Sequence, residues 1–384
     1  MSIQKKVVWI TNFPNQAVYT PMYETLGTIS NYNLTMYCPD KVAARKNTSN
    51  IFTLKFFKVF ELTKLINIIT LSAFSKERKI DLAFSVGFKE FTKTMDKEKP
   101  DILISNMWTN VFTWQAARYA KKRKIPFLFI PEMQRYPNSF LGKLFTKMTL
   151  PIMRRLVFRH AAKITPWTQQ AVTFAQHNFG VQKKKIIHLP PGVNITRFKP
   201  TKKKKNKQFT LLMVARCVPY KRHKDVIDAV QVLKEKGITV NVHFVVGGPY
   251  QKEIEDHIKT KQLNKQITFL QRTPHAQLYK VFNDHDAFIL PSYNEAIGMV
   301  IPEALACSLP CIVSDTCGGN QYITKDCGVI HKTKNVKSIA NSIESLMKRD
   351  LLHMQKNARA IAEKNYSLEV CAKRWKKILD SASK

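Results

Sequence analysis

The chain has 384 residues, of which 44% are hydrophobic, and this length is sufficient for two domains with sizeable cores. No stretch approaches the roughly 18 uncharged apolar residues of a membrane span, and the first residues lead directly into a strand-like segment without a signal-peptide pattern. The 63 Lys and Arg residues outnumber the 27 Asp and Glu residues, and the net charge of +36 favours a polyanionic partner, either nucleic acid or an anionic membrane face, unless it reflects only a lysine-rich, solvated surface.

Strand-like apolar runs alternate with helical patterns along the whole chain. In the first half the predicted strands are 7–12, 33–38, 101–106, 126–131 and 185–190, and in the second half they are 209–215, 240–247, 267–272, 286–292 and 310–315. The segments between them have helical spacing, as in 109–124 and 224–237. This alternation predicts βαβ units with parallel sheets, and runs that are apolar at every position indicate strands buried on both faces.

A polar, proline-marked and lysine-rich segment, 198–208, divides the chain into two α/β halves. We therefore predict an N-terminal Rossmann-like domain over 1–198 and a C-terminal one over 199–366. An amphipathic helix is expected over 367–384.

The seven cysteines are scattered, and the Cys307–Cys311 spacing matches no common zinc or redox pattern, so reduced thiols in a cytoplasmic protein are expected. The Asp284-x-Asp286 pair is a literal metal-binding motif, but it falls where a helix meets a strand and is expected to be structural. His223 follows a strand-end loop, where it would either contact phosphate or lie at the surface.

The most informative stretch is ILPSYNEAIGMVIPEALACSLPCIVSD, 289–315. Its strand is followed by a loop that contains Glu295, and a helix is expected to begin near Gly298 and to carry Glu303 in its first turn. A helix N-terminus at the carboxyl end of a parallel strand binds anions, and glycine lets the backbone approach a phosphate closely. A carboxylate can accept two hydrogen bonds from a sugar diol. The stretch therefore predicts a site for a phosphorylated sugar.

Three further loops follow predicted strands at the same end of the sheet. Arg216 and Lys221 form the first, which is suited to clamp an anion. The other two contain the pairs Gly247-Gly248 and Gly318-Gly319. Glycines after strands are common in turns, but four such loops at one sheet edge together favour a ligand site.

These motifs, in this order, resemble the C-terminal domain of the family 4 retaining glycosyltransferases. The Glu-x7-Glu spacing with its flanking residues is the most specific part, and the likeness is strong over 186–330 and weak before residue 100. The resemblance implies GT-B architecture: two Rossmann-like domains that face each other across a cleft, with the C-terminal helix returning to the N-terminal domain. It also implies an acceptor-binding N-terminal domain and a donor-binding C-terminal domain.

The resemblance further implies a UDP- or GDP-sugar donor and a metal-independent reaction without a cofactor. Arg216 and Lys221 would hold the diphosphate, Glu295 would contact the sugar and Glu303 the ribose. The remaining predicted donor contacts are the amides of Gly298, Met299 and Val300, the glycines 247, 248, 318 and 319, and Arg272 and Thr273 near the base.

The N-terminal half departs from the family pattern. Its first strand is followed by a loop without glycine, and no histidine precedes His160. Glu132, at the comparable strand end, is the candidate acceptor-side catalytic residue. It could equally be a structural partner of Arg135 or a helix cap.

Two basic, apolar segments, 139–163 and 50–70, resemble membrane-surface helices. We therefore expect a cytoplasmic glycosyltransferase, peripheral on the inner face of the plasma membrane, with a lipid-linked or glycan acceptor. One alternative is a polyanion- or nucleic-acid-binding protein on an inactive scaffold, although no specific nucleic-acid motif is present. The other is a sugar-nucleotide epimerase, which the Arg-Lys loop and the Glu-x7-Glu arrangement disfavour.

Overall fold

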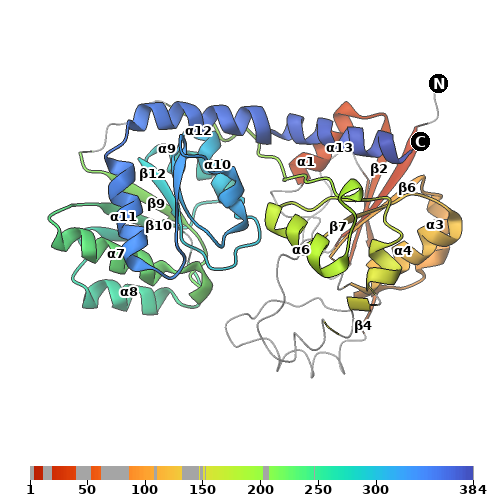
Figure 1. The fold of residues 1–384 in the computed structure, drawn as a ribbon, viewed down its shortest axis with the longest axis horizontal. Helices are drawn as coiled ribbons and strands as arrows, with labels where there is room; N and C mark the ends of the chain where they lie inside the picture. The colour runs from red at the N-terminus through yellow and green to blue at the C-terminus, as the bar shows by residue number, and fades with distance from the viewer. Residues whose placement is uncertain are drawn as a thin grey trace. The chain divides into compact units, whose positions relative to one another are not determined.

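A computed structural model of the chain describes residues 4–11, 20–39, 53–61, 86–107, 110–131, 147, 150–151, 153–201, 207–245 and 247–383. The chain divides into two units, Met1–Gly192 with Leu368–Lys384 (unit 1) and Val193–Ser367 (unit 2). Figure 1 shows the two units with many of their helices and strands labelled.

Unit 1 is built on a six-stranded sheet in the order β3-β2-β1-β6-β7-β8, and all its pairs are parallel. Its strands are β1 (Lys5–Ile10), β2 (Tyr32–Pro39), β3 (Thr53–Phe57), β6 (Ile102–Asn106), β7 (Phe127–Ile130) and β8 (Lys163–Ile164). β4 (Val59–Glu61) and β5 (Val86–Phe88) form a separate antiparallel pair. The helices described in this unit are α1 (Thr20–Ile29), α3 (Phe91–Glu98), α4 (Val111–Arg123), η2 (Arg154–Phe158), α6 (Gln169–Phe179), η3 (Lys183–Lys185) and α13 (Leu368–Ala382).

The strands β6 and β7 of unit 1 are buried along their whole length. Local sequence signals set both ends of helix α6. The Thr168 side chain caps its N-terminus by accepting a hydrogen bond from the Ala171 amide, and Gly180 ends the helix in the left-handed region at φ +61°.

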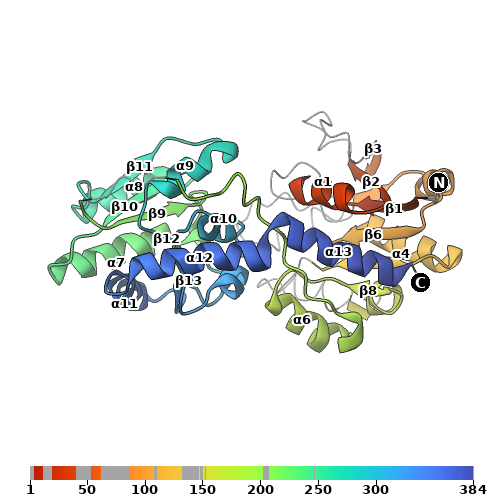
Figure 2. The same ribbon diagram turned by 90° about the horizontal axis from the view of Figure 1, so that it is seen from above.

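The C-terminal helix α13 packs on unit 1, which confirms the predicted return of this helix to the N-terminal domain. Its Trp375 is fully buried, with its ring centroid 5.0 Å from that of Trp9 in β1. The Tyr32 hydroxyl donates a hydrogen bond of 2.9 Å to Asp380. Figure 2 shows α13 alongside α1.

Unit 2 has a second six-stranded parallel sheet, in the order β11-β10-β9-β12-β13-β14. Its strands are β9 (Thr210–Val214), β10 (Asn241–Val245), β11 (Ile267–Leu270), β12 (Ala287–Leu290), β13 (Cys311–Ser314) and β14 (Gly328–His331). Its helices are η4 (Pro219–Lys221), α7 (His223–Glu235), α8 (Gln251–Thr260), η5 (His275–Gln277), α9 (Leu278–Asn283), α10 (Val300–Ala306), η6 (Gly318–Tyr322), α11 (Val336–Met347) and α12 (Leu351–Tyr366).

The two sheets share one order, in which the third strand from one edge comes first in sequence and the chain then builds outward on either side. This is the Rossmann order, and it confirms the prediction of two Rossmann-like α/β domains. The predicted strand 185–190 is wrong: only Ile186 forms a bridge, to Ile164, because Lys183–Lys185 turn as a 3₁₀ helix and Pro190 cannot donate to a sheet.

None of the helices in the described ranges combines the length and the apolar composition needed to cross a membrane.

Candidate active site

Several of the predicted ligand-binding residues of unit 2 lie in the loops after β9 and β12, the two neighbouring strands at which the strand order of the sheet reverses. β9 and β12 are neighbours in the sheet, yet the chain runs from β9 outward through β10 and β11 before it returns to β12. Such a point leaves a crevice at the carboxyl ends of the two strands, where open α/β sheets bind their ligands. Arg216 and Lys221 lie in the loop after β9, and Glu295 and Gly298 lie in the loop after β12.

Lys221 and Glu295 join these two loops through an ion pair. Their side chains are only 13% and 17% exposed, so the pair is largely shielded from solvent. Burial alone would lower the pKa of Lys221, but the neighbouring Glu295 carboxylate outweighs it and raises that pKa above its ordinary value. The Tyr293 amide also donates a hydrogen bond of 2.7 Å to the Tyr220 carbonyl. The loops therefore present a fixed cation and a fixed anion side by side.

Gly298 turns the chain from the β12 loop into α10. Its φ of +66° lies in the left-handed region, and a Cβ there would lie 3.1 Å from Leu290 and from Ile301. Glycine is therefore required for both conformation and space. Within the described ranges, the amides of Gly298, Met299 and Val300 donate to no backbone carbonyl, so they are available to an anion.

The second predicted glycine pair, Gly318-Gly319, lies directly against the Glu295 loop. The Gly318 amide donates to the Glu295 carbonyl at 2.9 Å, and a Cβ on Gly319 would lie 2.4 Å from the Ile297 carbonyl oxygen. These glycines let the loops after β12 and β13 meet.

The first glycine pair, Gly247-Gly248, lies against the Arg216 loop in the same way. A Cβ on Gly248 would lie 2.6 Å from the Cys217 carbonyl oxygen, and the Cys217 amide donates to the Gly247 carbonyl at 3.4 Å. All four predicted loops thus gather at the carboxyl edge of the unit 2 sheet.

Glu303 lies in the first turn of α10 and is one of the most buried acids in the described ranges, with a side chain only 4% exposed. Its Oε1 accepts a hydrogen bond of 2.7 Å from Nε2 of His275, while its Oε2 has no partner among the described residues. Burial raises the pKa of Glu303, and the bond from His275 opposes that rise. A buried carboxylate oxygen without a partner is ready to accept from a ligand hydroxyl.

Other predicted site residues make fewer contacts with the rest of the described protein. Arg216 is exposed directly after β9 and forms no ion pair with another described residue, so its guanidinium can reach an anion. Arg272 is exposed, and the Thr273 hydroxyl donates to the Gln271 carbonyl at 3.3 Å. Glu132 lies outside the described residues.

Two residues at this edge were not identified from the sequence. No sequence signal pointed to His275, although it lies two positions after Thr273, which is expected near the base. Lys334, after β14, places its Nζ 4.2 Å from the centre of the Tyr293 ring and adds a cation to the same edge.

The structure also decides the motifs whose role the sequence left open. His223 is buried rather than at the surface, and burial lowers its pKa to about 4, so its ring is neutral at physiological pH. Asp286 accepts a hydrogen bond of 2.9 Å from the Thr210 amide, which supports its structural role. Cys307 and Cys311 are both buried, as expected for core residues. In the part of the chain that is described, no three His, Cys, Asp or Glu side chains gather as a metal site would require.

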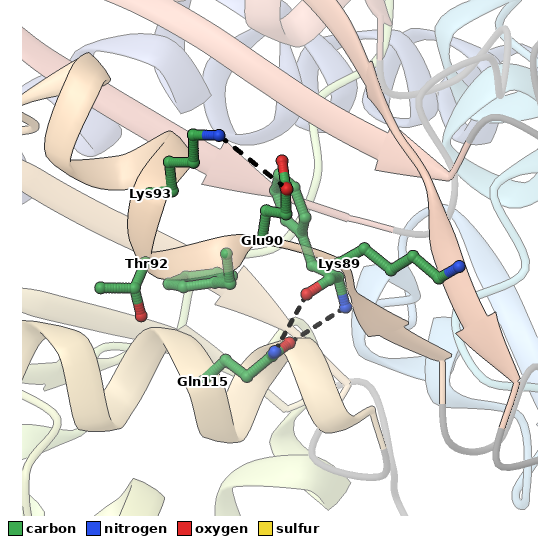
Figure 3. A pocket seen from close by; sticks show the side chains of 7 residues that line it. Lys89, Glu90, Thr92, Lys93 and Gln115 are labelled. Atoms are coloured by element: carbon green, nitrogen blue, oxygen red, sulfur yellow. Dashed lines mark hydrogen bonds and ion pairs between the residues drawn. The ribbon is translucent and has the colours of Figure 1, made fainter.

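A hollow of about 620 Å³ lies in unit 1, between the end of β5, the start of α3 and the first half of α4 (Figure 3). Gln115 brackets the Phe88 backbone there with two hydrogen bonds of 3.0 Å, and Glu90 lies 4.0 Å from Lys93. Lys89 and Thr92 also line the hollow, so it is suited to hydroxyl or anionic groups. It contains none of the predicted donor residues.

The chain is similar to proteins of one family. Residues 194–366 match the family described as "Glycosyl transferases group 1". The chain is 25% identical over 180 residues to the putative glycosyltransferase EpsF of Bacillus subtilis, an alignment that spans 44% of this chain and 46% of that relative. It is 26% identical over 297 residues to the N,N'-diacetylbacillosaminyl-diphospho-undecaprenol alpha-1,3-N-acetylgalactosaminyltransferase of Campylobacter jejuni, which covers 72% of this chain and 75% of that relative.

The fold is shared over the full length of solved structures. A glycosyltransferase from Rickettsia africae superposes with a TM-score of 0.73 at 16% identity, covering 100% of this chain and 99% of the other. Of the three functions that the sequence left open, the family match supports the transferase rather than the polyanion-binding protein or the epimerase. Residues 194–366 are therefore similar to the group 1 glycosyl transferases, and the chain shares the fold of the solved glycosyltransferase, as the resemblance of its motifs predicted.

Proposed function

We propose that this protein is a retaining glycosyltransferase that takes its sugar from a UDP- or GDP-linked donor bound at the carboxyl edge of the unit 2 sheet. One observation carries the proposal: the Lys221–Glu295 ion pair joins the loops after β9 and β12, where the strand order of the sheet reverses. Cations suit a diphosphate, and a carboxylate suits sugar hydroxyls.

In the proposed complex, Arg216 and Lys221 bind the diphosphate, together with the amides of Gly298, Met299 and Val300. Glu295 contacts the sugar that is transferred. The glycines that let the backbone approach the donor are Gly247, Gly248, Gly318 and Gly319. When the diphosphate arrives, it competes with Glu295 for Lys221, so donor binding would release the carboxylate toward the sugar.

The chemistry follows from these placements. The bond between the anomeric carbon and the β-phosphate oxygen breaks, and its electron pair stays on the diphosphate. The acceptor hydroxyl forms the new bond on the same face of the sugar, and its proton passes to the departing phosphate oxygen. Fixed cations stabilise the negative charge that develops, and the loss of one such group typically costs about 3 kcal/mol of barrier. The proposal needs no metal ion, because Arg216 and Lys221 neutralise the diphosphate.

The nucleoside would occupy the region beside α10. Glu303 would accept hydrogen bonds from the ribose hydroxyls through Oε2, which is buried and has no partner among the described residues, and Arg272 and Thr273 would lie near the base. Binding of the nucleoside would thus satisfy a carboxylate oxygen that the protein alone leaves without a partner.

For the acceptor we propose a lipid-linked or glycan substrate bound by unit 1, with Glu132 as its catalytic residue. Two similar proteins support this class, since their names specify diphospho-undecaprenol acceptors. The hollow beside Lys89 and Lys93 in unit 1 can receive hydroxyl or phosphate groups of such a substrate.

We further propose that the protein works in the cytoplasm, on the inner face of the plasma membrane. The net charge of +36 favours anionic lipids, and a lipid-linked acceptor requires proximity to the bilayer. Of the two segments expected to contact lipid, 50–70 and 139–163, the structure describes 53–61, 147, 150–151 and 153–163. Residues 53–61 form the strands β3 and β4 and not a helix, and Met153, Val157 and Phe158 are buried in the core of unit 1, so these parts do not support the expected contact with lipid. Co-sedimentation with liposomes tests the idea: stronger pelleting with anionic than with neutral lipid is expected, and equal pelleting with both would remove it.

The site assignment is tested by Arg216→Ala and Glu303→Ala. Each is expected to abolish sugar transfer and donor hydrolysis in a screen of UDP- and GDP-sugars while circular dichroism and the melting temperature stay close to those of the wild type. Glu253→Ala, at an exposed position of α8, is the matched control and should retain full activity. Activity that survives in both site variants would reject the assignment.

A further inference from the structure

Glu303 depends on one side chain of the described structure for its orientation. Its Oε1 accepts from Nε2 of His275 at 2.7 Å, and the two residues come from separate elements, α10 and η5. The carboxylate is almost fully enclosed, at 4% exposure, so water cannot replace this bond. The direction of Oε2 is therefore fixed by His275 together with the helix.

The imidazole is itself held in place. Its ring centroid lies 5.5 Å from that of Phe198, and the side chain is 27% exposed. Nδ1 is buried and has no partner among the described residues, whereas Nε2 faces the carboxylate. In the neutral ring the proton therefore belongs on Nε2, where it is donated to Glu303.

Two further segments of the chain place charged groups near the pair. Arg197, in the segment that precedes β9, acts on both residues and favours the ionised carboxylate. Arg359 of α12 donates to the Ala306 carbonyl at 2.7 Å, near the end of α10. Cys307 follows Glu303 by one turn, and burial raises the pKa of its thiol to about 12, so it does not titrate near neutral pH.

His275 and Glu303 each affect the pKa of the other. The hydrogen bond to Glu303 raises the pKa of His275 above its ordinary value, and burial raises the pKa of Glu303. Without the imidazole, Arg197 would be the remaining nearby positive charge, and the enclosed carboxylate would take up a proton at a higher pH than in the wild type. A protonated carboxyl group accepts weaker hydrogen bonds than a carboxylate does.

We propose that His275 is a positioning residue for the donor: it keeps the Glu303 carboxylate ionised and aimed so that Oε2 accepts from the ribose of the nucleotide. The proposal rests on the proposed function, because it assigns a role to the partner of a donor-binding residue. His275 acts through Glu303 and not on the sugar being transferred.

Two substitutions of His275 distinguish the effect of its hydrogen bond to Glu303 from the effect of its packing. His275→Gln places an amide N–H near the position of Nε2 and can still donate to Glu303. His275→Asn is similar in polarity, but its amide reaches only the position of Nδ1 and cannot make this bond. The melting temperature of each variant establishes that it is folded.

The affinity for UDP or GDP, whichever the wild type binds, is measured by calorimetry from pH 5.5 to pH 8.5. The affinity for the matching 2′-deoxy nucleotide is measured in the same way. At pH 7.5 we expect His275→Asn to weaken binding about tenfold and His275→Gln to stay within a few-fold of the wild type. As the pH falls toward 5.5, His275→Asn should lose further affinity while the wild type does not. The preference for ribose over deoxyribose should shrink in His275→Asn as it does in Glu303→Gln.

The outcomes distinguish the two levels of the proposal. If Glu303→Gln loses the ribose preference but His275→Asn keeps it, together with the wild-type pH profile, the role of His275 is overturned while the proposed donor site stands. If His275→Gln is as weak as His275→Asn, the ring acts by packing and the positioning role is likewise overturned. If the wild type binds neither nucleotide, both the donor site and the role of His275 fail.

Discussion

The two units share a strand order, but each surrounds its buried glutamate differently. Glu98 in unit 1 has a side chain that is 6% exposed, and its carboxylate is paired with Lys6 and Lys55 at 2.5 Å each and with the Tyr37 hydroxyl at 2.7 Å. Glu303 in unit 2 is equally buried but receives one hydrogen bond, and its second oxygen has no described partner.

The comparison shows how to separate structural from functional acids on one scaffold. A carboxylate with a lysine of the protein beside each oxygen, as in Glu98, holds elements together, whereas one whose second oxygen meets neither a cation nor a hydrogen-bond donor of the described residues, as in Glu303, is suited to receive a ligand. Burial alone does not distinguish them. The partner count does: the three partners of Glu98 support a structural role in unit 1, and the single partner of Glu303 agrees with the binding role that we propose for it in unit 2.

The largest expected effect is on catalysis in unit 2. Lys221→Ala removes a fixed cation from the leaving diphosphate, so kcat should fall at least about a hundredfold, equivalent to about 3 kcal/mol of barrier. Steady-state kinetics with the donor that the enzyme uses will measure it. Lys252→Ala, at an exposed position of α8, is the matched control and should be unchanged. A Lys221→Ala enzyme with wild-type kcat would remove this lysine from the site.

The next effect is on stability in unit 1. Glu98→Gln leaves two lysines without their shared anion, and because Lys6 and Lys55 are 28% and 42% exposed the loss should be smaller than for a fully buried pair, about 1–2 kcal/mol in the free energy of unfolding. Urea denaturation will measure the loss. Activity per folded molecule should not change, because Glu98 lies outside the donor site. A drop in kcat at unchanged stability would contradict the structural role of this acid.

Glu98 also predicts how the stability of the protein changes with pH. Burial would raise the pKa of Glu98, but the hydrogen bonds from Lys55, Lys6 and Tyr37 outweigh it and lower that pKa to about 2. Because the folded value lies below the unfolded value of about 4.3, the stabilisation is complete above that pH and is lost as the pH falls toward 2. Unfolding curves of the wild type should therefore show this acid-dependent loss, and those of Glu98→Gln should lack its contribution.

A smaller effect is expected at the turn into α10. Gly298→Ala forces a side chain into the left-handed region at φ +66° and brings a Cβ to 3.1 Å from Leu290 and Ile301, at a cost of about 1–2 kcal/mol. Thermal melting and donor KM should both be affected, since the same turn presents the amides. Gly237→Ala is the control for strain alone, because its φ is +74° but no atom lies within 4 Å of the added Cβ. Equal donor KM in the two variants would argue against a role for the Gly298 turn in binding.

Much of unit 2 was predictable from the sequence because its strands carry an unambiguous pattern. The run 209–215 became β9 (Thr210–Val214), fully buried as its apolar sequence indicated. Once parallel strands are predicted, all strand-end loops must meet at one edge, so the gathering of Arg216, Lys221 and Glu295 followed from topology and not from any local signal.

The pairings at that edge could not be predicted in the same way. Lys221 and Glu295 are 74 positions apart, and His275 and Glu303 are 28 apart, so which side chains meet depends on loop conformations that have no period. The strand expected at 185–190 failed for a related reason, since an apolar run next to Pro190 can meet a sheet edge through a single bridge, here Ile186 to Ile164, without continuing as a strand.

The most direct test of the central claim is hydrogen–deuterium exchange of the wild type with and without UDP or GDP. The account predicts that the nucleotide slows amide exchange in unit 2, in the loops 216–222, 293–300 and 317–320, and leaves residues 88–93 of unit 1 unchanged. Protection confined to unit 1, or no protection in any of the three unit 2 loops under saturating nucleotide, would contradict it.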